Sequence, residues 1–404
     1  MLFLVTTSNY FDYNVLSILL QPIKDEFHVS DTMLGMLSGI FFALIYAAAG
    51  LPLARWADRG NRRTVITVSL ALWSVMTAMC GFAHSFWQLA LARFGLGAAE
   101  PGALPPSQSL IADYFPPQRL ATASAILNAG SCAGYLVGVV LGGSIAAVYG
   151  WRAAFLFAGA PGLLLAVVVR LMLPEPRCQL GFPTASGLQT ESLREALRQL
   201  RRKRAFLYAL AGTSVYTIFS FGTGVFLPSF MIRALGATLA QVSLTWGVAL
   251  AVADLGGALA GGWLTDRLSR RDIRWRAWVP VLGCTVATPL YLVAFLAQHL
   301  WTFIALDFVA EFIVTLGMSV CFAVVHSVCG NSRRTMAIAI AQLSFVLVGC
   351  GLGPLITGVL SDTLSALYGA QSLRYSLVTM VFFLVPAAIA FQHSGRAMPA
   401  ELED

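Results

Sequence analysis

An aspartate interrupts an apolar stretch close to the start of the chain. The segment "NYFDYNVLSILLQPI", Asn9 to Ile23, places Asp12 among aromatic and aliphatic side chains. A carboxylate in hydrocarbon surroundings is costly, so a residue of this kind marks a functional-site hypothesis and requires a partner. The first question posed by this sequence is therefore which group shares the environment of Asp12.

Candidate partners stand in the stretch "ARFGLGAAE", which contains Arg93 and Glu100. A separation of seven residues is two helical turns, so the two side chains share one helix face about 10 Å apart along the axis. The mundane interpretation is a static buried ion pair that stabilises a helix bundle. Buried ion pairs are weak stabilisers, and acids inside membranes usually mark pathways, which favours a role in moving protons.

A second group of acids lies in the other half of the chain. Asp307 and Glu311 are four residues apart and share a helix face, in a stretch that has no lysine or arginine. For Glu311, the sequence supports two interpretations equally: binding of substrate or a proton, and a neutral packing role. For Asp254, which also lies deep in an apolar stretch, the packing role is favoured.

The composition indicates the kind of environment in which these residues lie. The chain is 58% hydrophobic and 11% charged, with a mean hydropathy of +0.75, whereas charged residues alone run near 25% in soluble domains. This predicts an integral membrane protein. About twelve apolar stretches reach the length that spans a bilayer, near 2–23, 32–54, 64–83, 86–112, 119–147, 152–173, 205–230, 238–264, 277–297, 300–328, 335–360 and 374–392.

The net charge of +7 reports orientation in the membrane. Numbered along these stretches, the arginine-rich segments 55–63, 198–204, 267–276 and 333–334 all fall on one side. By the positive-inside rule that side is cytoplasmic, as are both termini. The pattern argues against nucleic acid as a partner and for contact with membrane lipids. The seven cysteines show no disulfide or metal-ligand spacing, and we expect no metal and no cofactor.

The chain is duplicated. "LARWADRGNRR" at 53–63 and "GGWLTDRLSRR" at 261–271 read alike, and Gly134, Gly138 and Gly143 align with Gly349, Gly353 and Gly358. We therefore predict an all-α membrane protein with twelve transmembrane helices in two pseudo-symmetric six-helix bundles, 1–173 and 205–404. Between them, 174–204 is predicted to be a cytoplasmic linker with an amphipathic helix.

These motifs resemble the major facilitator superfamily. The two arginine-rich loops and "ARFGLGAAE" match its motifs, and "NYFDYNVLSILLQPIKDEFHVSD", "SQSLIADYFPPQRLATA" and "GLGPLITGVLSD" resemble its bacterial Spinster-like branch. The resemblance implies a secondary transporter that alternates between inward- and outward-open states. It implies that the first, fourth, seventh and tenth helices line a central cavity. Asp12, Arg93 and Glu100 would then form one buried cluster that carries protons.

The resemblance also assigns roles to further residues. It implies a substrate cavity that includes Asn9, Tyr13, Tyr216, Phe219, Asp307 and Glu311. It implies that charged residues at the cytoplasmic helix ends hold one state closed by pairing across the halves, namely Asp58, Arg59, Arg62, Arg63, Asp113, Asp266, Arg267, Arg271 and Asp362. The branch usually has Asp-Arg in its first helix, but here the pair is Asp12-Tyr13, which removes a cation from the cavity.

The expected function is proton-coupled transport of an amphipathic or lipid-like molecule, of lysophospholipid or sphingoid type, across a bacterial inner membrane by a monomer. A proton-coupled symporter of small organic anions is the alternative. An integral membrane enzyme, a channel and a non-transporting sensor are alternatives of other classes. No metalloprotease motif, phosphate-binding glycine loop or nucleophilic serine turn supports the enzyme, so we expect none.

Overall fold

The structure is a computed structural model that describes residues 1–175, 200–318 and 334–401. Within these residues the chain is helical and contains no strand. It divides into two compact units, Met1–Leu188 with Thr238–Val248, and Gln189–Ala237 with Ala249–Asp404. The predicted linker helix falls largely on residues outside the described ranges.

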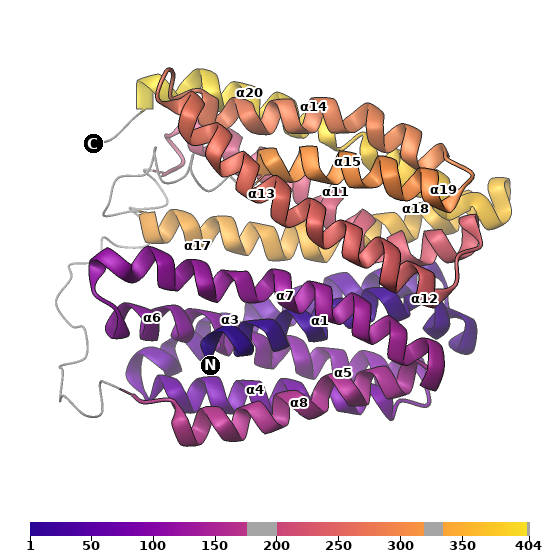
Figure 1. The fold of residues 1–404 in the computed structure, drawn as a ribbon, viewed down its shortest axis with the longest axis horizontal. Coiled ribbons are helices and arrows are strands. Elements are labelled where there is room, and N and C mark those ends of the chain that lie inside the picture. The colour runs from indigo at the N-terminus through magenta and orange to yellow at the C-terminus, as the bar shows by residue number, and fades with distance from the viewer. Residues whose placement is uncertain (176–199, 319–333, 402–404) are drawn as a thin grey trace. The chain divides into compact units, whose positions relative to one another are not determined.

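The first unit contains eight α-helices of the N-terminal half, joined by short π and 3₁₀ segments (Figure 1). They are α1 (Leu2–Phe27), α2 (Asp31–Gly35), η1 (Met36–Ile40), α3 (Phe41–Arg59), α4 (Arg62–Gly81), α5 (Phe86–Ala99), η2 (Glu100–Gly102), α6 (Leu104–Tyr114), α7 (Pro117–Tyr149) and α8 (Trp151–Met172). The short α12 (Leu239–Gln241) and η3 (Val242–Trp246) also belong to this unit.

The second unit holds the remaining helices of the described chain. They are α11 (Arg204–Leu235), α13 (Gly247–Ser269, from Ala249 onward), α14 (Trp275–Leu296), α15 (Leu300–Met318), α17 (Arg334–Ser344), η4 (Phe345–Leu352), α18 (Gly353–Tyr368), η5 (Gly369–Gln371), α19 (Ser372–Val381) and α20 (Leu384–Glu401).

Each predicted apolar stretch is mostly helical where the chain is described, with breaks at Ala103 in the fourth stretch and at Phe382 and Phe383 in the last. By length and hydropathy, nine helical segments of the described residues qualify as membrane spans. The segment α1 is not among them, nor is the fourth predicted stretch, in which η2 lies between α5 and α6. One segment of the nine, Ile340–Glu401, covers two predicted stretches. The number of twelve crossings and the cytoplasmic termini stay predictions.

In the first unit α1 lies against α7, and glycines make the contact possible (Figure 1). A methyl group on Gly134 would stand 2.4 Å from the backbone oxygen of Thr7, and one on Gly138 would stand 3.0 Å from that of Phe11. Small residues at this spacing let two helix backbones approach closely. The predicted close-packing role of these glycines is therefore visible in the structure, and it fixes the helix that carries Asp12.

The second unit repeats this contact between α11 and the η4–α18 segment. A methyl group on Gly353 would stand 2.6 Å from the backbone oxygen of Ile218, and one on Gly349 would stand 2.5 Å from the Cβ of Thr217. These two glycines are the ones that align with Gly138 and Gly134 in the sequence comparison of the halves. The same device thus holds the first helix of each half.

We predict that Gly134→Ala lowers the thermal midpoint of the purified protein, because the added Cβ overlaps the α1 backbone and overpacking costs about 1–3 kcal/mol. Gly262→Ala in α13 is the matched control, since its Cβ meets nothing within 4 Å. Scanning fluorimetry in detergent compares the two variants. Equal midpoints would show that the α1–α7 contact tolerates a wider separation than its geometry indicates.

Candidate functional site

Asp12 is fully buried within the first unit. Its side chain is 0% exposed, and neither carboxyl oxygen has a hydrogen-bond partner of ordinary geometry within the described chain. The side chains that face it as donors are Thr77 and Trp73 of α4, and the charge that acts on it is that of Arg93. The sequence prediction that Asp12 is buried and shares its environment with Arg93 is thus visible in the geometry.

Arg93 projects from α5 into the same buried region. It is 2% exposed, and its guanidinium lies over the ring of Phe155 at 5.4 Å from the centroid. The ion pairs shorter than 4.0 Å in the described chain do not include Arg93. Arg93 therefore interacts with Asp12 by charge at a distance longer than that of an ion pair. The two residues do not form the direct contact that a static ion pair requires.

Glu100 completes the predicted cluster at a break in the helix. Pro101 has no backbone N–H to donate, and the chain turns from α5 into the 3₁₀ segment η2 at Glu100. The Glu100 side chain is 5% exposed, interacts by charge with Asp12 and Arg93, and faces the amide of Asn9 as a donor. Two acids and one base therefore meet in one buried cluster, with Asn9 of the predicted cavity beside them.

A separate, partly buried acid network occupies the second unit. The hydroxyl of Tyr291 on α14 donates to Glu311 Oε2 at 2.5 Å. The hydroxyl of Thr315 lies 3.0 Å from Asp254 Oδ1 and 3.3 Å from Glu311 Oε1, so it bridges α13 and α15. Asp254 thus belongs to the same network as Glu311, and these hydrogen bonds are compatible with the packing role that the sequence favoured for it.

The other predicted cavity residues lie near these two groups. Asp307 is 1% exposed, on the same helix as Glu311, and its charge acts on Asp254 and Tyr291. Phe219 of α11 packs edge to face on Tyr291 with centroids 5.0 Å apart, and Tyr216 lies next to Phe219. In the first unit, half-buried Tyr13 packs on Phe42.

Arg62, a predicted gating residue, is buried at one end of the first unit. It is 1% exposed and donates to Asp113 at 2.6 Å, to Glu175 at 2.7 Å and to the Ser109 hydroxyl at 2.8 Å. The backbone N–H of Arg63 donates to the other oxygen of Glu175. Asp113 therefore pairs within its own half in this structure, while the sequence suggested it as an acceptor across the halves.

The remaining gating residues are placed differently from Arg62. The side chains of Asp58 and Arg59 lie outside the described residues. In the second unit Asp266, Arg267 and Arg271 are exposed, and Asp362 is half-buried. Arg267 lies over the ring of Trp263 at 5.5 Å. The two arginine-rich loops, although similar in sequence, thus differ in burial.

We predict that Arg62→Gln destabilises the protein by about 3 kcal/mol, since removing one partner strands the buried carboxylate of Glu175. The figure is the lower end of the usual range because Asp113 is partly exposed. The matched control is Arg270→Gln, the equivalent position of the second loop, where the arginine is exposed. The thermal midpoints of the two variants are compared with that of the wild type. A small loss of thermal midpoint that is the same in both variants would contradict a structural role for Arg62.

The opposite end of this unit carries its own ion pairs. Arg152 binds Glu26 through two hydrogen bonds of 2.7 and 2.6 Å, and Trp151 Nε1 donates to the same carboxyl at 2.7 Å. The hydrogen bond from Arg152 lowers the pKa of Glu26. Lys24 pairs with the buried Asp31 at 2.6 Å. These contacts join the end of α1 to α2 and α8.

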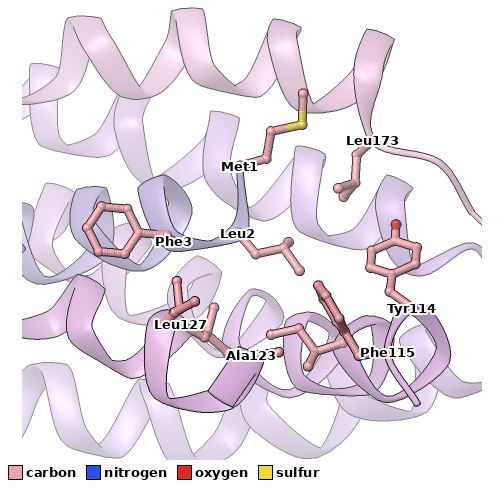
Figure 2. A pocket seen from close by; sticks show the side chains of 10 residues that line it. Met1, Leu2, Phe3, Tyr114, Phe115, Ala123, Leu127 and Leu173 are labelled. Carbon is pink, nitrogen blue, oxygen red and sulfur yellow. The ribbon is translucent and has the colours of Figure 1, made fainter. Parts of the chain in front are cut away.

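A pocket of about 240 Å³ opens beside the first residues of α1 (Figure 2). Its lining is almost wholly apolar and comes from α1, α6, α7 and the end of α8, namely Met1, Leu2, Phe3, Ile111, Tyr114, Phe115, Ala123, Ile126, Leu127 and Leu173. None of these is a predicted site residue, so the pocket is distinct from the Asp12 cluster.

Comparison with known families decides the class of protein. Residues 2–294 match the family model described as Major Facilitator Superfamily, and a second match covers residues 221–397. The chain belongs to the Major Facilitator Superfamily. Because members of this superfamily are transporters, the enzyme alternative gains no support from its relatives.

Three relatives bear the names of different transporters. An MFS-type efflux pump of Mycolicibacterium smegmatis is 32% identical, covering 94% of this chain and 87% of the relative. A probable L-galactonate transporter of Escherichia coli is 26% identical, with 97% and 87% covered. The sphingosine-1-phosphate transporter SPNS2 of Danio rerio is 24% identical, with 95% and 80% covered.

The solved structures include one that supports the Spinster resemblance. A bacterial homologue of the human lysosomal transporter Spinster, solved in an inward-facing and unoccupied conformation, superimposes with a TM-score of 0.90 at 28% identity. The match covers 100% of this chain and 97% of that one. The resemblance to Spinster-like members of the Major Facilitator Superfamily, predicted from sequence motifs, is confirmed.

The structure also shows functional candidates that the sequence reasoning missed. Glu175 follows the end of α8 in a stretch interpreted as linker, so nothing marked it as the partner of Arg62. Tyr291, Trp73 and Thr77 are residue types that ordinarily pack in apolar helices. Of these, only the spacing of Trp73 and Thr77, four residues apart on one helix face, carried a signal.

Proposed function

We propose that this protein is a proton-coupled secondary transporter that works by alternating access, as a monomer in a bacterial inner membrane. Asp12 and Glu100 are the proton carriers and Arg93 is their common partner. The proposal rests on one observation above others: Asp12 is 0% exposed, and none of the ion pairs in the described chain includes it. A permanently ionised carboxylate in that position would be strongly unfavourable, whereas a carboxyl that binds and releases a proton is not.

The second acid strengthens this proposal. Glu100 and Asp12 act on one another by charge and on the same guanidinium, so the cluster holds two acids and one base. Such a cluster titrates as a unit, and a change in the distance of Arg93 from either acid changes which of them holds the proton. Coupling to transport requires a site whose proton affinity differs between states. Because Arg93 forms no ion pair with either acid, its distance from them can change between states and alter that affinity.

We assign the remaining polar and aromatic residues to substrate binding and to gating. Asn9 and Tyr13 in the first unit, and Tyr216, Phe219, Asp307 and Glu311 in the second, are the proposed substrate contacts. Their mixture of aromatic faces and few polar groups suits an amphipathic molecule. The charged helix ends, including Arg62 with Asp113 and Arg267 with Arg271, are the proposed gating elements.

For the substrate we propose an amphipathic, lipid-like molecule of lysophospholipid or sphingoid type, in keeping with the SPNS2 relative. A small organic anion carried with protons is the second candidate, favoured by the L-galactonate relative. Position 13 bears on the choice between the two substrate classes. Tyr13 offers an aromatic surface there and no positive charge. Any anionic group of the substrate must then rely on Arg93.

The experiment that tests this proposal is counterflow in proteoliposomes that contain the purified full chain. Lysophosphatidylcholine, a sphingoid phosphate, galactonate and muconate are each loaded inside the liposomes, and uptake of the labelled compound is followed. Saturable counterflow of a lipid-like compound alone supports the first candidate, and counterflow of a sugar acid or dicarboxylate alone supports the second. Flux equal to that of protein-free liposomes for all four would contradict both substrate classes.

A further inference from the structure

Two buried donors of α4 face Asp12. Trp73 and Thr77 are four residues apart, so they share one helix face, and they are 0% and 1% exposed. Both face the Asp12 carboxyl as donors. Yet Trp73 Nε1 and Thr77 Oγ1 are buried without a hydrogen-bond partner of ordinary geometry in the described chain, and so are both carboxyl oxygens of Asp12.

Buried polar groups are normally satisfied, and each exception calls for an explanation. An indole N–H and a hydroxyl are donors that complement a carboxylate, which only accepts. A protonated carboxyl needs fewer donors than the carboxylate. Donors that face an acid at the margin of hydrogen-bond geometry therefore suit a site whose acid alternates between the two forms.

The donors are fixed from behind by α8. A methyl group on Gly159 would stand 2.5 Å from the backbone oxygen of Ser74, and one on Gly162 would stand 2.1 Å from the Ser74 hydroxyl oxygen. Ser74 is the neighbour of Trp73, so α4 is clamped against α8 at the level of the donors. Closure of the hydrogen bonds must then come from movement of Asp12 or of α1.

We propose that Trp73 and Thr77 are positioning residues: their N–H and O–H groups hold the carboxylate of Asp12, release the protonated form, and so set the pH at which Asp12 loads. This inference rests on the proposed role of Asp12 as a proton carrier. The other charged or titratable groups that act on Asp12 or respond to it are Arg93, Glu100 and the thiol of Cys80. All three are unchanged when a donor is removed, so a variant isolates the donor.

The test is infrared difference spectroscopy of the full-length protein across a pH titration. The carboxyl C=O band that disappears in Asp12→Asn is assigned to Asp12, and its intensity measures the protonated fraction without any need for transport or substrate. Thr77→Val and Trp73→Phe each remove one donor, while Thr77→Ser retains the hydroxyl. A hydrogen bond to a charged group is strong enough to move such a titration midpoint by about one pH unit.

We expect the midpoint of the Asp12 band to move upward by about one pH unit in Thr77→Val and in Trp73→Phe, and to stay in place in Thr77→Ser. If one donor variant does not fold, the other carries the test. Midpoints equal to that of the wild type would overturn the role of the donors and leave the proton carrier intact. An Asp12 band that does not titrate at all would overturn the proposed function of Asp12 as well.

Discussion

Arg93→Gln is expected to lower the thermal midpoint sharply, and Asp12→Asn in the same chain is expected to restore part of the loss. The guanidinium is the cation that acts on two buried acids, Asp12 and Glu100. Removing one member of a buried charged group typically costs about 3–5 kcal/mol, because the charge left behind has no compensation. Neutralising Asp12 removes one of the two stranded acids, so the two changes must be strongly non-additive.

A double-mutant cycle measures this coupling. Thermal midpoints are compared for the wild type, Arg93→Gln, Asp12→Asn and the double variant, with Arg170→Gln at the exposed end of α8 as the control for loss of an arginine. A coupling of about 1–3 kcal/mol between positions 12 and 93 is expected for residues in one network. If Arg93→Gln lowered the thermal midpoint no more than Arg170→Gln does, the result would contradict a charge cluster of Asp12, Arg93 and Glu100.

Asp12→Asn alone is expected to abolish uphill accumulation of substrate driven by a proton gradient while preserving exchange of substrate across the membrane. Asparagine has nearly the shape of a protonated aspartic acid and cannot release a proton. The variant is thus arrested in the loaded form of the carrier. Exchange requires only movement between loaded states, whereas accumulation requires the proton to leave, so the two activities separate.

Uptake against a gradient and counterflow are measured on the same proteoliposomes for this comparison. Asp31→Asn is the matched control, because Asp31 is also a buried acid of the first unit but is paired with Lys24. We expect Asp31→Asn to retain accumulation. Accumulation by Asp12→Asn at the rate of the wild type would exclude Asp12 as an obligatory carrier, and loss of both activities would point to a structural role.

The helices could be predicted because the membrane imposes a length and a composition on each of them. Each predicted stretch is mostly helical in the described chain. The separation of Arg93 and Glu100 by two turns, together with the burial of Asp12 in an apolar segment, was enough to propose the cluster. Helical periodicity transmits such spacing directly from sequence to geometry, so side chains on one helix are the predictable part of a site.

Contacts between helices were less predictable, since a single sequence carries little information on which residues face one another. Asp254 of α13 meets the hydroxyl of Thr315, which also contacts Glu311 on the same helix, α15, and no spacing along the chain reveals that α13 faces α15 at this point. Glu175 reaches Arg62 from a position 113 residues away. Trp73 and Thr77 gain meaning only once Asp12 is known to lie beside α4.

The measurement that tests the central claim most directly is proton movement into proteoliposomes that enclose a pH-sensitive dye, with wild-type protein and with Asp12→Asn. The substrate identified by counterflow is added outside with no gradient imposed. We predict a substrate-evoked pH change with the wild type and none with Asp12→Asn, although the variant still exchanges substrate. An equal pH change with both proteins would contradict proton coupling through Asp12.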